Sequence, residues 1–136
     1  MQLASKMSCP RAYPGCGFLD ATTVVISGGC NSQGDQKTCE AFDLVSLTFS
    51  PFPDMLESRH GHVVVHYNGT LVIISGLTKR TCEEYDRETN QWKSFASVTA
   101  TRYYFGASVV EGKIYVVGNG GAEVFDGTAW SSLDGA

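Results

Sequence analysis

The stretch Leu71-Val72-Ile73-Ile74-Ser75-Gly76 decides the fold, because closely related stretches occur twice more in this chain of 136 residues. A run of aliphatic and β-branched residues that ends in glycine predicts a β-strand followed by a turn. The other copies are Thr23-Val24-Val25-Ile26-Ser27-Gly28 and Ile114-Tyr115-Val116-Val117-Gly118. The sequence therefore predicts the same strand three times.

Each of these strands lies at the same place in a longer repeat. The repeat opens with an arginine, and the openings at Arg11, Arg59 and Arg102 are 48 and 43 residues apart. A period of about 40 to 50 residues is typical of arrays of small β-sheets that must stack to bury their faces. After the strand, each copy has a Glu-x-aromatic-Asp step and a further aromatic residue: Cys39-Glu40-Ala41-Phe42-Asp43 with Phe49, Cys82-Glu83-Glu84-Tyr85-Asp86 with Trp92, and Ala122-Glu123-Val124-Phe125-Asp126 with Trp130.

The second copy shows four strand signals between two arginines. Asn68-Gly69 favours a tight hairpin between the first two strands, and residues 86–90 are rich in turn-forming side chains. The second strand is apolar enough to be covered on both faces. The predicted strands are residues 61–67, 71–76, 82–85 and 91–96, and a four-stranded antiparallel meander with this period is typical of a propeller blade.

The apolar run, the glycine, the spaced aromatic residues and the opening arginine resemble the kelch repeat over nearly the whole chain. Only the first copy has two adjacent glycines, Gly28-Gly29, and Phe49 stands where the repeat normally has Trp. No Trp-Asp dipeptide occurs, which speaks against the WD-repeat propeller. The resemblance implies an all-β fold of kelch-type β-propeller blades, with three four-stranded antiparallel sheets.

The number of repeats predicts an incomplete ring. We expect a kelch-repeat region over residues 1–136, with the end of a preceding blade's outer strand in 1–10 and blades in 11–58, 59–101 and 102–136. Propellers usually close with about four to eight blades, so three blades form a partial propeller or half of a six-blade ring. The first and last sheets would expose apolar faces, which predicts a homodimer or further blades of the same chain as partner. The residues expected on these faces are Val24, Ile26, Val116 and Phe125.

Composition excludes some classes of partner. The net charge of −4 disfavours nucleic acid, and no apolar run approaches the roughly 20 residues of a membrane span. The five cysteines form no Cys-x-x-Cys pair, and residues 1–10 show no secretion signal. Free thiols suit a reducing compartment, so we expect the cytoplasm, with the nucleus as the alternative. The sequon at Asn68 is explained by the hairpin that Asn-Gly forms.

Histidines and nucleophiles give weak signals for chemistry. His60 and His62 are spaced so that both could reach one metal ion from a strand, but the sequence places no carboxylate or cysteine beside them. Ser27 and Ser75 simply precede glycines at strand ends, and no nucleophile motif or phosphate-binding loop occurs. Some kelch-like propellers are enzymes, but their added catalytic residues are not found here. We therefore expect no metal, no cofactor and no enzyme activity.

The charges are predicted to separate between the two ends of the blades. First strands start and second strands end on one side, so the opening arginines share it with the loops that carry Lys37, Lys79 and Arg80. The arginines could brace these loops through backbone carbonyls, or they could form a basic surface that attracts an acidic peptide. The acidic turns, with Asp43, Asp86, Glu88 and Asp126, lie on the other side.

By resemblance to kelch domains of ubiquitin-ligase adaptors, we expect a protein-interaction module that binds an acidic or turn-forming peptide segment through this basic side. An actin-binding or other cytoskeletal role is the alternative within binding proteins, and a sugar-processing or metal-dependent enzyme is the alternative from another class. The candidate partner-binding residues are Arg11, Tyr13, Asn31, Gln33, Arg59, His60, Lys79, Arg80, Arg102 and Tyr103, with Tyr104 and Asn119 beside them.

Overall fold

A computed structural model describes residues 6–133, which form strands, turns and loops without a helix. Each repeat is one four-stranded antiparallel sheet. No helix in this part of the chain is long and apolar enough to cross a bilayer. The first sheet contains β1 (Gly15–Phe18), β2 (Thr23–Ser27), β5 (Cys39–Asp43) and β6 (Thr48–Phe52). The second contains β7 (Val63–Tyr67), β8 (Thr70–Ile74), β9 (Cys82–Asp86) and β10 (Gln91–Phe95). The third contains β11 (Gly106–Val110), β12 (Lys113–Val117), β13 (Ala122–Phe125) and β14 (Trp130–Ser132).

The predicted all-β fold of kelch blades is confirmed, with small differences at strand ends. Strand β7 begins two residues later than expected, because Gly61 has a φ of 69° and turns the chain before the strand. Strand β8 ends at Ile74, because Ser75 and Gly76 both have positive φ. A short hairpin of β3 (Cys30–Asn31) and β4 (Gly34–Asp35) lies where the sequence predicted only a loop.

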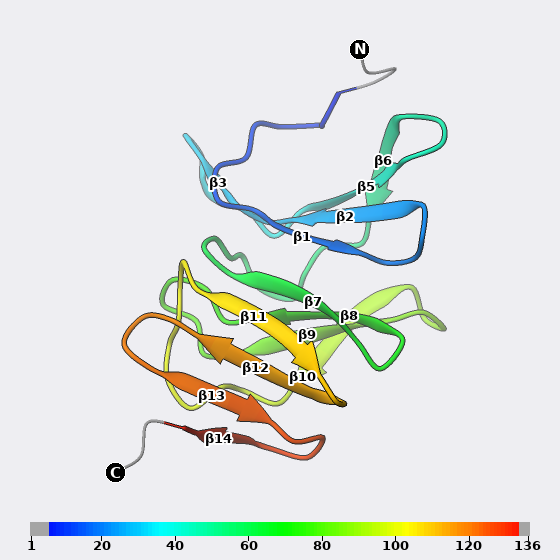
Figure 1. Cartoon of the computed structure of the whole chain (residues 1–136). Coiled ribbons are helices and arrows are strands. Elements are labelled where there is room, and N and C mark those ends of the chain that lie inside the picture. Colours follow the sequence, from blue (N-terminus) through cyan, green and yellow to red (C-terminus); the bar gives the residue numbers. More distant parts are fainter. Residues whose placement is uncertain (1–5, 134–136) are drawn as a thin grey trace.

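The sheets stack face to face along the chain, with the inner strands β1, β7 and β11 side by side (Figure 1). Strand β8 is buried on both faces, as its apolar sequence predicts. Leu71 and Ile73 belong to the core between the first and second sheets. Val72 and Ile74 belong to the core between the second and third. The period of two in a strand thus assigns alternate residues of one strand to two different cores.

In the second and third blades, a tryptophan on the fourth strand forms a hydrogen bond with the link that precedes the blade. The indole Nε1 of Trp92 donates to the carbonyl of Pro53 at 2.9 Å, and that of Trp130 donates to the carbonyl of Ala96 at 2.8 Å. Both rings are buried. In the first blade, Phe49 packs on Phe42 with ring centroids 4.7 Å apart, and a phenyl ring has no such donor.

The prediction that Val116 and Phe125 lie on the open apolar face of the third sheet is wrong. Val116 and Phe125 are buried against the second sheet, with exposed fractions of 0% and 5%. The alternation places Val110 and Val117 on the outer face instead, and both are exposed. At the other end, Val24 and Ile26 are half-buried, while Val25 between them faces the core.

The segment before the first blade repeats a connection seen between blades. The backbone N–H of Ser8 donates to the Glu40 carboxylate, as those of Leu56 and Thr99 donate to Glu83 and Glu123. Residues 6–10 contain no strand, and the outer strand predicted in 1–10 lies partly outside the described residues. The observed part therefore corresponds to a link that enters a blade.

Candidate functional site

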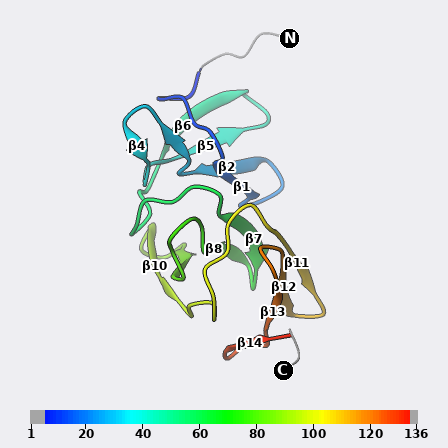
Figure 2. The same cartoon turned by 90° about the vertical axis from the view of Figure 1, so that its left-hand side faces the viewer.

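One end of the blades carries most of the predicted site residues, and we call it the loop face. It consists of the loops between the second and third strands (residues 28–38, 75–81 and 118–121) and the links that enter the blades (residues 53–62 and 96–105). Figure 2 views the molecule after a quarter turn and shows the hairpin strand β4 and several of these connections on the side facing the viewer.

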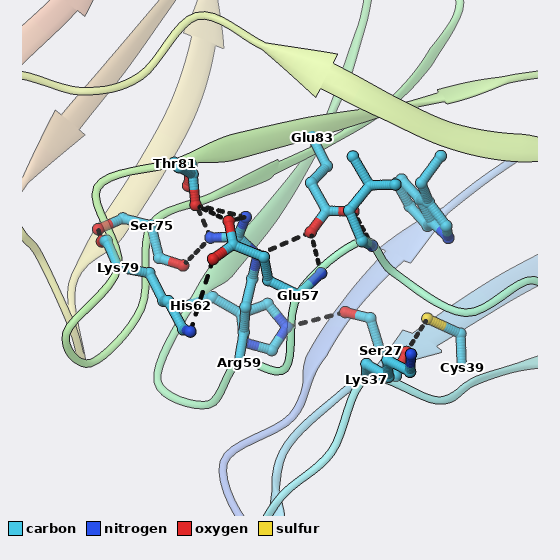
Figure 3. Close-up of polar contacts among 12 residues, drawn as sticks. Ser27, Lys37, Cys39, Glu57, Arg59, His62, Ser75, Lys79, Thr81 and Glu83 are labelled. Carbon is cyan, nitrogen blue, oxygen red and sulfur yellow. Dashed lines mark hydrogen bonds and ion pairs between the residues drawn. The ribbon is translucent and has the colours of Figure 1, made fainter.

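Arg59 lies inside the protein rather than on the loop face. Its side chain is fully buried, and Nε donates to the Glu83 carboxylate at 3.0 Å. Nη1 donates to the carbonyls of Ser75 at 2.9 Å and Thr81 at 2.6 Å, and Nη2 to Thr81 Oγ1 at 2.9 Å. Figure 3 shows the guanidinium surrounded by these groups. Arg59 thus joins the end of β8, the following loop and β9 within its own blade.

The other opening arginines also pair with the glutamate of their own blade and with backbone carbonyls of the following loop. Arg102 Nε donates to Glu123 at 2.9 Å and its Nη1 to the carbonyl of Gly118 at 3.0 Å. Arg11 Nη2 donates to Glu40 at 3.2 Å and its Nη1 to the carbonyls of Gly28 and Thr38. The side chain of Arg11 is 0% exposed and that of Arg102 is 3% exposed.

These contacts correct the expected role of Arg11, Arg59 and Arg102. A buried guanidinium that already donates to a carboxylate and to backbone carbonyls of its own blade is not available to pair with a partner's carboxylate. The three arginines therefore brace the loops of their own blades, which was the alternative weighed for them. The counterpart that the sequence analysis missed is the glutamate of the Glu-x-aromatic-Asp step, which is the second residue of the third strand in every blade.

The exposed charges on the loop face are also partly neutralised. Lys79 Nζ lies 3.5 Å from the Glu57 carboxylate, which also accepts from Thr81 Oγ1. These bonds, led by the Thr81 hydroxyl, lower the pKa of Glu57 below its ordinary value, so the ion pair persists at neutral pH. Arg80 is exposed and Lys37 is exposed. The loop face is therefore less basic than a count of its residues predicts.

A line of backbone hydrogen bonds connects the three blades on this face. The residue two positions after each arginine has a left-handed backbone, with φ of 55° at Tyr13, 69° at Gly61 and 51° at Tyr104. Gly61 N–H donates to the Tyr13 carbonyl at 3.1 Å, and Tyr104 N–H donates to the Gly61 carbonyl at 2.8 Å. Left-handed φ is uncommon for a tyrosine and is sustained here by these bonds.

The tyrosines gather into an exposed aromatic cluster around Gly61. The rings of Tyr13 and Tyr104 lie 5.0 Å apart, and those of Tyr103 and Tyr104 lie 5.4 Å apart. His60 lies 6.1 Å from Tyr104 and 6.3 Å from Tyr13. A side chain at Gly61 would meet Tyr104 at about 3.0 Å, so the glycine leaves room for the ring. Tyr13 and Tyr104 are 60% and 55% exposed, so both rings are accessible to a partner.

The hairpin of β3 and β4 brings polar residues to the same place. Asn31 donates from Nδ2 to the Pro10 carbonyl at 3.1 Å and accepts from Gln33 N–H at 2.8 Å. Asp35 Oδ1 lies 2.8 Å from His60 Nδ1. Desolvation, followed by the charges of Tyr13, Cys30 and Asp35, raises the pKa of the Tyr104 hydroxyl above its ordinary value. The structure thus gathers Tyr13, His60, Tyr103 and Tyr104. Asn31 and Gln33 lie on the β3–β4 hairpin, and Lys79 and Arg80 lie on the loop of the next blade.

His60 and His62 do not converge on one site. His62 is buried, and its Nε2 lies 2.9 Å from Ser27 Oγ in the preceding blade (Figure 3). Burial, with the nearby Arg59 charge, lowers the pKa of His62 to about 3. A neutral buried imidazole between two sheets is a packing group. The turn at Gly61 separates the two histidines, which the strand periodicity could not foresee.

Comparison with known proteins supports the repeat assignment. An F-box/kelch-repeat protein of Arabidopsis thaliana is 29% identical over 127 residues, which is 87% of this chain and 32% of the relative. Kelch-like protein 41a of Danio rerio is 39% identical over 120 residues, 82% of this chain and 20% of the relative. Kelch-like protein 24 of Homo sapiens is 27% identical over 121 residues, 85% of this chain and 20% of the relative. No protein-family model matches the chain.

The chain spans about a fifth to a third of the length of these relatives. The similarity covers all three repeats, and the repeats coincide with three antiparallel four-stranded sheets. The names of these relatives describe them as kelch-repeat or kelch-like proteins. The chain accordingly belongs to the kelch-repeat β-propeller family, and residues 6–133 form three blades.

Proposed function

We propose that the chain is a protein-interaction module whose loop face binds a peptide segment of a partner protein. The exposed aromatic cluster of Tyr13, His60, Tyr103 and Tyr104 is the observation that carries this proposal. Large aromatic side chains that hydrogen-bond at one end and pack at the other are enriched at the centres of interfaces. The backbone bonds across the blades hold two of these tyrosines in place before binding, which reduces the entropy cost of association.

The structure changes the expected chemistry of the peptide. With the arginines buried, the positive charge available to an acidic segment comes from Lys37, Lys79 and Arg80 in the loops of the same face. A turn-forming segment that places an apolar or aromatic residue against Tyr13 and Tyr104 fits the surface better. Acidic residues of the segment would contribute at the rim, where exposed charges are worth about 0 to 1 kcal/mol.

The relatives suggest the biological setting. One is an F-box/kelch-repeat protein and others are kelch-like proteins, so we propose that this chain selects the substrate of a ubiquitin ligase in the cytoplasm. Actin is the alternative partner that the same experiment would reveal. The kelch relatives support binding rather than catalysis as the role of the loop face.

The test is affinity capture of partners, followed by direct binding measurements with each purified partner. Replacing both Tyr13 and Tyr104 by Ala should weaken binding at least tenfold, because hot-spot aromatics typically cost more than about 1 to 2 kcal/mol when truncated. Val45→Ser is the matched control, since Val45 is 79% exposed on a turn at the opposite end of the first blade. Equal affinity of the tyrosine variant and the wild type would contradict the proposal.

A further inference from the structure

Three potential metal ligands meet on the loop face, although they come from two blades. One ligand atom each of Cys30, Asp35 and His60 lies within 4.8 Å of the other two. Cys30 and Asp35 face each other across the β3–β4 hairpin, and His60 comes from the link into the second blade. The closest pair, His60 Nδ1 and Asp35 Oδ1, is 2.8 Å apart.

The backbone holds each of the three residues in position. Cys30 N–H donates to the Ala12 carbonyl at 2.8 Å, and the Cys30 carbonyl accepts from Ala12 N–H at 2.9 Å. Next to Asp35, Gln36 N–H donates to the Gly29 carbonyl at 2.8 Å. His60 accepts at its carbonyl from Leu77 N–H at 3.0 Å. A site assembled on hydrogen-bonded backbone requires only side-chain rotations to close on an ion.

The donor set selects the kind of ion. A thiolate, an imidazole and a carboxylate suit Zn²⁺ and related divalent transition metals, whereas Ca²⁺ and Mg²⁺ take mainly oxygen ligands. Ligand bonds of about 2.0 to 2.3 Å to a tetrahedral ion place the ligand atoms about 3.3 to 3.7 Å from one another. To bind an ion, the His60 and Asp35 ligand atoms, which are 2.8 Å apart, would move apart by about 0.5 Å, and atoms as far apart as 4.8 Å would approach by about 1 to 1.5 Å. Thiolate and carboxylate together balance the charge of a divalent cation.

We propose that Cys30, Asp35 and His60 bind one divalent transition-metal ion of the zinc class, with the fourth position open to water. The side chain of Asp35 is 32% exposed and that of His60 is 12% exposed, so an ion can reach the group from solvent. Tyr13 and Tyr104 flank His60. The ion would join the hairpin of the first blade to the link of the second.

The probes are Zn²⁺ and Co²⁺, each added alone to the full chain with its thiols reduced. We expect saturation at one ion per chain and, with Co²⁺, the charge-transfer absorption of a cobalt–thiolate bond. Cys30→Ser should abolish that absorption. Asp35→Asn and His60→Gln should each weaken Zn²⁺ binding by at least about tenfold, since even second-layer partners of metal ligands cost 10- to 100-fold.

The control variants are Cys16→Ser and His66→Gln, which alter an exposed thiol and an exposed imidazole elsewhere on the chain. Both should bind the ions like the wild type. Absence of saturable binding, unchanged affinity in all three ligand variants, or equal loss in the controls would overturn the proposal. Asp35→Asn alters a side chain on the surface, so its result stands even if His60→Gln perturbs folding. The outcome is independent of whether the loop face binds a peptide.

Discussion

At the scale of single residues, the arginine that opens each blade is a structural group. Replacing Arg59 by Met should lower the free energy of unfolding by about 3 to 5 kcal/mol, because Glu83 would stay buried without its counter-charge. Chemical denaturation measures the change. Arg80→Met is the matched control, since Arg80 is exposed and its Nη1 donates to the Thr99 carbonyl over a long distance of 3.5 Å. This change should alter stability by no more than about 0.5 kcal/mol.

Removing both partners of the buried pair distinguishes bracing from a binding role. The double variant Arg59→Met, Glu83→Gln should be more stable than the sum of the single effects predicts, because no uncompensated carboxylate remains. If Arg59→Met instead left stability unchanged and weakened partner binding, the buried-brace interpretation would be wrong.

His62 gives the fold a predictable dependence on pH. Its pKa of about 3 lies below the value of about 6.5 in an unfolded chain, so between these values the unfolded state binds the additional proton. The stability that depends on the neutral ring is therefore complete above about pH 6.5 and is lost as the pH falls toward 3, by at most about 4 to 5 kcal/mol.

The measurement is the free energy of unfolding between pH 7 and 4 for the wild type and His62→Gln. Other groups titrate in this range, so the informative quantity is the difference in slope. We expect a shallower decline in His62→Gln and an unchanged decline in the control His66→Gln, whose ring is exposed. Parallel curves for the wild type and His62→Gln would show that His62 titrates normally.

At the scale of the element, the glycines after the second strands are required by close approach. Gly28 has a φ of 59°, and a Cβ there would lie 2.5 Å from the Arg59 carbonyl oxygen of the next blade. Gly69 also has positive φ, 82°, but nothing lies within 4 Å of its added Cβ. Gly69→Ala should cost about 1 to 2 kcal/mol for backbone strain alone. Gly28→Ala should lower the free energy of unfolding by about 1 to 3 kcal/mol more than Gly69→Ala does. Equal losses for the two variants in chemical denaturation would contradict the close-approach argument.

The strands were predictable from sequence because their pattern is local. The apolar residues on either side of the Asn68-Gly69 turn predicted the ends of β7 and β8 to within two residues. The second blade lacks the adjacent glycines of the first blade, but its backbone has the same conformation at this place. Ser75-Gly76 takes the place of Gly28-Gly29, since Ser75 has the φ of Gly28, 59°, and both carbonyls accept from the arginine of their own blade.

The candidate site was less predictable because its contacts join different blades. The sequence identified Tyr13, His60 and Tyr103 as neighbours of the arginines, and the structure gathers them. It could not show that each arginine pairs with a glutamate 21 to 29 residues later in its own blade, because the pair joins the link that enters the blade to the third strand. Nor could it place Asp35 and Cys30 beside His60, because the β3–β4 hairpin lies in a loop without a strand pattern.

At the scale of the whole molecule, the two end sheets each have one face without a neighbouring blade among the described residues. On the third sheet, this face includes Val110 and Val117, which are 50% and 61% exposed. On the first sheet, Val24 and Ile26 are half-buried. Covering a large apolar side chain contributes about 1.5 to 3 kcal/mol, so we expect these faces to be covered by further blades or by a second chain.

Light scattering on the 136-residue chain tests this expectation directly. We expect association at micromolar concentration, either into a dimer that forms a six-blade ring or into larger species. Val117→Asp should shift the population toward the monomer, because a carboxylate on the outer face of β12 would be desolvated on contact. Val45→Asp adds the same charge at a turn that is 79% exposed and should leave association unchanged. A monomer that persists at every concentration and binds no dye for exposed apolar surface would show that the open faces need no cover.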